Sequence, residues 1–175
     1  MIQKMKRRSL NVLAGICSAF ILCTTGISCK KSSDGGEPKY YMRFKENGTQ
    51  VAYNTTAQAA FSSASGLYMC VLNGLDPKSN MNIILTDKSP IAANINYTEQ
   101  ILPGLANSYV FITYQNSNGV SFLSGNPLAD QDASAKVTLT AITDDYVKGT
   151  FSGKLTNGST IVTITEGEFI LKRVN

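Results

Sequence analysis

The residues of this chain that could do acid–base chemistry are carboxylates, because none of its 175 residues is histidine. The lack of histidine excludes Ser-His-Asp and Cys-His catalysis, and it also excludes histidine-ligated metal or haem. Two acidic pairs are close in sequence, Asp130-x-Asp132 and Asp144-Asp145. Paired carboxylates can hydrolyse glycosidic bonds without histidine, and their oxygens are also ligands for a hard cation such as calcium.

Both acidic pairs have a simpler interpretation. Asp130 and Asp132 lack the further ligand spacing of a calcium-binding loop, which favours a solvated acidic loop and leaves cation binding there open. Asp144-Asp145 stands directly before Tyr146, where adjacent acids favour a turn. The sequence therefore assigns no catalytic residue, no cofactor and no metal ligand, and it predicts a protein that is not an enzyme. A small hydrolase is the weakest of the alternatives.

A different chemistry is indicated at Cys29. Four basic residues among the first eight precede an apolar run of 13 residues, Leu10 to Leu22, which is the layout of a secretory signal peptide. The run is shorter than the ~20 residues that span a bilayer, which argues against a retained transmembrane anchor. Ser28-Cys29-Lys30 resembles a bacterial lipobox, in which a small residue precedes a cysteine that is acylated and becomes the first mature residue. We therefore expect a lipoprotein signal peptide over residues 1–28 and lipidation of Cys29.

The predicted mature chain is electrically balanced. The net charge of +4 comes from 16 basic and 12 acidic residues, and the signal peptide removes four basic residues and no acids, leaving 12 of each. Charge therefore gives no argument for a nucleic-acid partner. Cys70, the one thiol left after processing, lies in the apolar run Leu67 to Leu72 and is predicted to be a buried small hydrophobe.

The elements that must position these residues are predicted to be strands. Residues 30–38 hold no apolar residue except Pro38, so residues 29–38 are expected to be the lipidated cysteine and a flexible tether. Beyond them, Val, Ile and Thr alternate with polar residues at a period of two. The segments with strand character cover residues 40–45, 50–53, 67–72, 81–85, 96–100, 108–114, 120–123, 137–141, 147–155, 160–164 and 168–171.

From these eleven segments we expect about eight short strands in one domain over residues 39–175. Asn47-Gly48 predicts a type I′ hairpin turn. Thr55 to Ser65 is the one stretch that could pass for a helix, and a loop or irregular strand is the preferred interpretation. Connections too short for crossover helices predict antiparallel pairing. The predicted fold class is all-β, an antiparallel immunoglobulin-like β-sandwich, with a partly closed β-barrel as the alternative.

The glycines of the C-terminal strands have a structural interpretation. Val147, Phe151 and Leu155 should share one face with Gly149 and Gly153. A missing side chain there lets a large neighbour lie over the backbone, or it marks a bulge. Gly167, between two glutamates, similarly predicts a bulge or a sharp turn.

The same region resembles a known family. Val137-x-Leu-Thr, Val147-x-Gly-Thr-Phe-Ser-Gly and Val162-Thr-Ile-Thr-x-Gly-x-Phe are similar to the pattern of small Bacteroides-type lipoproteins of unknown function, as is the layout of lipobox, tether and one all-β domain. The resemblance implies a β-sandwich at the cell envelope and brings no catalytic residues. It matches about the last 40 residues and, separately, the lipobox.

The functional expectation is an envelope lipoprotein with a non-enzymatic binding or structural domain. Its membrane partner is reached through the lipid anchor, at the outer membrane, with the domain facing the periplasm or the cell surface. Eight tyrosines and seven phenylalanines could stack on sugar rings, although most fall in predicted strands, where aromatic residues commonly pack in the core. An accessory glycan-binding lipoprotein is therefore the alternative, and both a protein and a glycan partner stay open.

Overall fold

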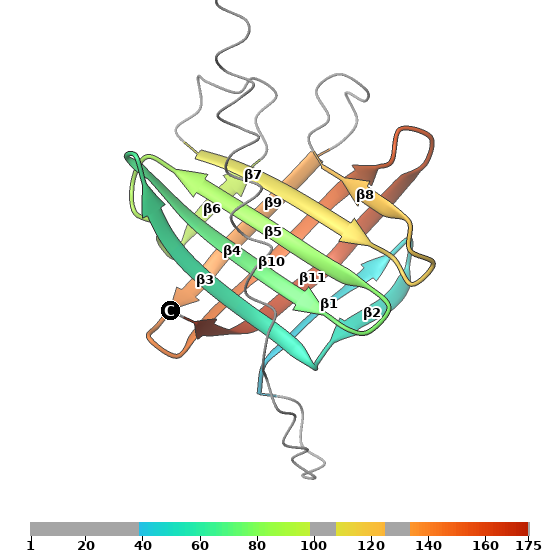
Figure 1. Cartoon of the computed structure of the whole chain (residues 1–175), viewed down its shortest axis with the longest axis horizontal. Coiled ribbons are helices and arrows are strands. Elements are labelled where there is room, and N and C mark those ends of the chain that lie inside the picture. The colour runs from blue at the N-terminus through green and yellow to red at the C-terminus, as the bar shows by residue number, and fades with distance from the viewer. Residues whose placement is uncertain (1–38, 99–107, 125–133, 175) are drawn as a thin grey trace, which may run out of the picture. The chain divides into compact units, whose positions relative to one another are not determined.

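The computed structural model describes residues 39–98, 108–124 and 134–174, and these residues contain eleven strands (Figure 1). Within these residues no helix is long and apolar enough to cross a membrane. Cys29, Asp130 and Asp132 lie outside them. The strands are β1 (Tyr41–Glu46), β2 (Thr49–Tyr53), β3 (Thr56–Ala64), β4 (Leu67–Leu75), β5 (Asn80–Asp87), β6 (Ile95–Thr98), β7 (Ser108–Gln115), β8 (Ser121–Leu123), β9 (Ser134–Ile142), β10 (Tyr146–Thr156) and β11 (Ile161–Val174).

The all-β prediction is confirmed, but the count of about eight strands is too low. The clearest difference is β3, which the sequence pattern predicts to be a loop or irregular strand. It is a regular strand that pairs with β4 along its whole length, from Thr56 opposite Leu75 to Ala64 opposite Leu67. Alanine and serine have weak intrinsic preference for strands, and pairing with an apolar neighbour overrides that preference.

The strands form one large mixed sheet in the order β2-β1-β11-β3-β4-β5-β7-β8-β10-β9-β6, and β11 also pairs with β10. The pairing is antiparallel except between β3 and β11, which run parallel where Gln58 to Ala60 lie beside Lys172 to Val174. The expectation of wholly antiparallel pairing is therefore wrong at this one place. Connection length restricts only strands that follow each other in sequence, and β3 and β11 do not.

The core lies between two parts of this sheet. Figure 1 shows β3, β4, β5 and β7 in front of β9, β10 and β11. Side chains from both parts belong to a single cluster of buried residues, for example Leu72 and Ile112 from one part and Val137 and Leu171 from the other. Alternate residues of each strand are buried, because successive side chains of a strand point to opposite faces.

The longest strand, β11, is bent by a bulge at Glu166 and Gly167. Glu166 has a φ of 52°, and the register shifts there against both β1 and β10. A β-carbon at Gly167 would overlap the backbone oxygen and the ring of Phe151. The predicted bulge is confirmed, and the two predicted segments 160–164 and 168–171 are one continuous strand.

Two further local predictions are confirmed. The turn between β1 and β2 has positive φ at Asn47 (47°) and Gly48 (87°), as a type I′ turn requires. In β10, Phe151 is buried while its neighbour Thr150 is exposed, so the predicted face is the inner one. Gly149 lies beneath the ring of Phe169, which a β-carbon would overlap.

Candidate functional site

The acidic pair Asp144-Asp145 forms part of a turn. The turn joins β9 to β10, and the Thr143 hydroxyl accepts hydrogen bonds from the backbone N–H groups of Asp145 (3.3 Å) and Tyr146 (3.0 Å). The carboxylate of Asp144 is fully exposed and lies 3.7 Å from the guanidinium of Arg173. The contacts of Asp144 and Asp145 are therefore those expected of residues that form a turn. Asp130 and Asp132 lie outside the described residues.

Cys70 is fully buried in β4, as the sequence pattern predicts. Burial raises the pKa of its thiol to about 12, because the apolar interior disfavours the thiolate. Since the thiolate is the nucleophile and the metal ligand, this cysteine is unsuited to either role at neutral pH. Within the described part of the chain, no group of three or more cysteine or acidic residues could hold a metal ion.

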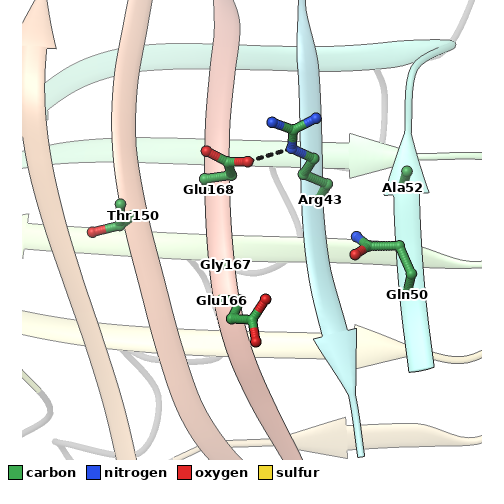
Figure 2. Close-up of a pocket in the computed structure, with 7 residues that line it drawn as sticks. All are labelled: Arg43, Gln50, Ala52, Thr150, Glu166, Gly167 and Glu168. Atoms are coloured by element: carbon green, nitrogen blue, oxygen red, sulfur yellow. Dashed lines mark hydrogen bonds and ion pairs between the residues drawn. The ribbon is translucent and has the colours of Figure 1, made fainter. Parts of the chain in front are cut away.

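An open groove of about 740 Å³ lies over the outer face of β2, β1, β11 and β10 (Figure 2). We call it the charged groove. Arg43 forms an ion pair with Glu168, its cross-strand partner, and the Lys45 ammonium lies 2.7 Å from the Glu166 carboxylate. The residues that line the charged groove are Arg43, Gln50, Ala52, Thr150, Glu166, Gly167 and Glu168.

The two glutamates of the charged groove are the acidic pair that the sequence pattern does not single out. They flank Gly167 at the bulge of β11, and both are turned to the outer face (Figure 2). Glycoside hydrolysis needs two carboxyl groups with different environments, one of them held protonated. In this groove each carboxylate instead has its own cation, and all four side chains are at least a third exposed. The arrangement is therefore one of surface ion pairs that link β1 to β11, each contributing about 0–1 kcal/mol.

The outer face of β3, β4, β5 and β7 has the opposite character. Among the described residues of these strands, no outward-pointing side chain is charged, whereas most inward-pointing ones belong to the core. We call this surface the uncharged face. The strand register arranges its central residues in three rows of four, and each row crosses all four strands.

The middle row of the uncharged face is apolar. Its members are direct cross-strand partners, and we call them the apolar row: Ala60, Val71, Ile84 and Phe111. All four are partly exposed, and none packs against the buried core cluster. The ring of Phe111 is stacked with that of Tyr109, with ring centroids 6.3 Å apart and ring planes within 15° of parallel.

Mostly polar side chains border the apolar row on both sides. The amide row is Gln58, Asn73, Asn82 and Thr113, and the hydroxyl row is Ser62, Met69, Thr86 and Tyr109, of which Met69 alone lacks a hydroxyl group. Within the amide row, the Asn82 amide donates to the Thr113 hydroxyl at 3.4 Å. The side chains of Gln58 and Asn73 make no hydrogen bond to any described residue. The face thus combines an apolar stripe with uncharged hydrogen-bonding groups.

A small pocket of about 280 Å³ lies beside the hydroxyl row. Ser62 and Met69, which belong to the hydroxyl row, line the pocket together with the apolar side chains of Phe61, Tyr68 and Ile91. The guanidinium of Arg173 lies 4.8 Å from the centroid of the Phe61 ring. It also donates to the backbone oxygen of Thr143 at 3.1 Å and pairs with Asp144, so its charge is already engaged.

No protein-family model matches the chain, and no curated protein or solved structure matches it either. The resemblance to small envelope lipoproteins therefore stays an expectation from the sequence pattern. The features of the described residues that bear on function are two extended surfaces, the uncharged face and the charged groove.

Proposed function

We propose that this chain is an envelope lipoprotein, anchored through acyl chains on Cys29, whose residues 39–175 form a non-enzymatic binding domain. The observation that carries the binding role is the uncharged face. Soluble surfaces normally intersperse charges of both signs, as the outer face of β1 and β11 does with Arg43, Lys45 and the two glutamates. Four adjacent strands without an outward charge, crossed by an apolar row, are typical of an interaction surface.

The sequence supports the anchoring part of the proposal. A cationic start, a short apolar run and Ser28 before Cys29 are the features that lipoprotein processing needs. Two acyl chains suffice for stable membrane attachment. The polar residues 30–38 would then present the domain at a distance from the outer membrane, toward either the periplasm or the cell surface.

The proposal also includes a finer classification of the fold. In an immunoglobulin-like sandwich, two sheets pack face to face without sharing hydrogen-bonded pairs. Here β11 pairs with β3 on one side and β10 on the other, and β8 pairs with both β7 and β10. This continuity supports the partly closed barrel over the sandwich.

Oxidative footprinting in the native envelope tests the binding role without assuming a ligand. Met69 lies on the uncharged face and Tyr41 lies on the outer face of β1 with Arg43, and both are partly exposed. We expect hydroxyl radicals to modify Met69 less in intact envelopes than in the purified protein, while Tyr41 is modified equally in both. Equal modification of Met69 in the two samples would show that the face has no occupant and would contradict the proposal.

A further inference from the structure

We propose that the uncharged face binds a neutral, linear glycan, laid across the strands along the apolar row. This inference rests on the proposed binding function and names the chemical class of its ligand. Three properties of the face carry it: the absence of charge, the order of its rows, and the hydrogen-bonding groups that stay available.

The first step concerns charge. A charged ligand loses hydration on binding, and it regains that energy only if the site offers an opposite charge. None of the described outward side chains on β3, β4, β5 and β7 can offer one. A neutral ligand has no such cost, so the face discriminates against nucleic acids, anionic lipids and acidic glycans.

The second step concerns the order of the rows. A sugar ring has apolar C–H faces and a rim of hydroxyl groups, so it is complementary to an apolar surface with polar edges. The apolar row supplies that surface, with the stacked rings of Phe111 and Tyr109 at one end. It crosses four strands and is therefore about 14 Å long, and the polar rows lie about 7 Å to either side. These dimensions suit a short oligosaccharide with its hydroxyl groups over both polar rows.

The third step concerns hydrogen bonding. Hydroxyl groups both donate and accept, and a side-chain amide offers both functions in one group. Asn82 and Asn80 are held by each other and by the neighbouring strand, because Asn80 donates to Gln115 at 3.0 Å. Next to them Gln58 and Asn73 have no partner among the described residues. The amide row therefore has two groups that are fixed to the sheet by their backbone and available to a ligand.

Area argues against a second copy of the chain as the occupant. The three rows cover roughly 400 Å², taking four strands about 4.8 Å apart and six residues at about 3.4 Å each. A stable protein–protein interface buries about 800 Å² on each partner. The three rows are therefore smaller than the area that a stable dimer buries on each partner, and they are large enough for an oligosaccharide.

Isothermal titration of the full mature lipoprotein, in a detergent without a sugar head group, tests the inference. The probes are cellohexaose, xylohexaose, mannohexaose and maltohexaose, with hexagalacturonate as the acidic comparator. We expect at least one neutral hexasaccharide to bind, and to bind more tightly than hexagalacturonate. Binding of none of the four, or tighter binding of hexagalacturonate, overturns the inference.

A matched pair of variants locates the binding. Asn73→Asp removes the two N–H donors of the amide and places under the ligand a carboxylate that loses hydration, so it should weaken binding about tenfold, the effect of about 1.4 kcal/mol. Asn96→Asp makes the same change on β6, where Asn96 only accepts a hydrogen bond from Thr138, and should leave affinity unchanged. Phe111→Thr, also an outward change, should weaken binding as Asn73→Asp does, and thermal melting checks that each variant is folded. Equal affinity for Asn73→Asp and the wild type overturns the inference.

The remaining outcomes separate this inference from the proposed function. If Met69 is protected in the envelope but no hexasaccharide binds, the face is a binding surface for another partner, and the glycan inference alone fails. If sedimentation shows a dimer that Asn73→Asp dissociates, the occupant is a second copy and the glycan inference again fails.

Discussion

Two buried tyrosines, Tyr53 and Tyr114, differ in what their hydroxyl groups contact. Tyr114 donates to the Glu46 carboxylate at 2.7 Å, whereas the Tyr53 hydroxyl is buried without a hydrogen bond to any described residue. A hydrogen bond to a charged group contributes about 1.5–3 kcal/mol, and an unsatisfied hydroxyl is itself a cost. We therefore expect Tyr114→Phe to lower the free energy of unfolding by about that amount, and Tyr53→Phe to leave it unchanged or raise it. Urea unfolding of both variants is the measurement, and equal losses would contradict the assignment.

The buried hydroxyl of Tyr53 and the buried thiol of Cys70 predict how stability depends on pH. Burial raises the pKa of Tyr53 from 10.0 to about 12 and that of Cys70 from 9.0 to about 12. Because these pKa values are higher in the folded protein, the stability they contribute is fully present below pH 9 and is lost as the pH rises toward 12. We expect the free energy of unfolding to fall from pH 9 upward, and to fall less steeply in Tyr53→Phe. Identical slopes for the variant and the wild type would show that Tyr53 ionises as readily folded as unfolded.

Phe151 and Thr150 test the register of β10. Phe151 is buried against Phe44 and Phe169, with ring centroids 5.8 and 6.2 Å away, and Thr150 is exposed. Phe151→Ala should lower the free energy of unfolding by about 3–5 kcal/mol, since it removes apolar contacts and leaves a cavity. Thr150→Ala should change it by about 0.5 kcal/mol or less. A similar loss for both variants in urea would mean that the faces of β10 are wrongly assigned.

At the scale of elements, Gly149 couples β10 to both of its neighbours. A β-carbon there would overlap the backbone oxygen of Thr138 on β9 and the ring of Phe169 on β11. Gly149→Ala should therefore lower the free energy of unfolding by about 1–3 kcal/mol, as overpacking does. Gly66 in the β3–β4 turn has open space but a φ of 78°, which asparagine tolerates. Gly66→Asn should cost about 0.5 kcal/mol or less, and the two melting curves together distinguish close packing from backbone strain.

Features that depend on neighbouring residues were predictable from the sequence. The Asn47-Gly48 turn, the inner face of β10 and the bulge at Gly167 each follow from a few consecutive positions. The sheet order was not predictable, because β3 and β11 are brought together by the rest of the fold and not by a short connection. The strand character of β3 was missed for the same reason, since its alanines and serines become a strand only beside β4.

The candidate site could be predicted only in part. Aromatic residues in strands indicated a glycan alternative, but alternation within one strand cannot show that outward residues of four strands are all uncharged. That requires the register, which places Val71 beside Ile84 and Ile84 beside Phe111. The ion pair between Arg43 and Glu168 joins residues 125 positions apart, so no local pattern could indicate it.

At the scale of the whole molecule, charge divides the outer surface of the sheet into two parts, one over β1 and β11 and the other over β3, β4, β5 and β7. The side of β1 and β11 carries ion pairs between Lys45 and Glu166 and between Arg43 and Glu168. Such pairs keep that side hydrated and discourage association. The side of β3, β4, β5 and β7 lacks this protection, so it is the side on which a ligand displaces water at least cost.

The same division predicts that the full mature protein turns over no substrate. The chain has no histidine, and its cysteine in the described domain is buried with its pKa raised to about 12. The remaining machinery is carboxylate chemistry, and Glu166 and Glu168 each face a cation in an open groove. Glycoside hydrolysis by carboxyl groups needs two acids flanking the bound substrate, one of them kept protonated.

Screening glycosides, esters and peptides with the wild type and with Glu166→Gln, Glu168→Gln, Asp144→Asn and Asp145→Asn is the measurement, extended to Asp130→Asn and Asp132→Asn. We expect no turnover in any of them. The prediction is contradicted if the wild type hydrolyses a substrate and one of these changes abolishes that hydrolysis in a variant that still melts like the wild type. That result would identify a catalytic acid and would mean that the domain is a small hydrolase. The changes at 166 and 168 test the charged groove and the four aspartate changes test the other acids, and each change removes one charge while nearly preserving the size of the side chain.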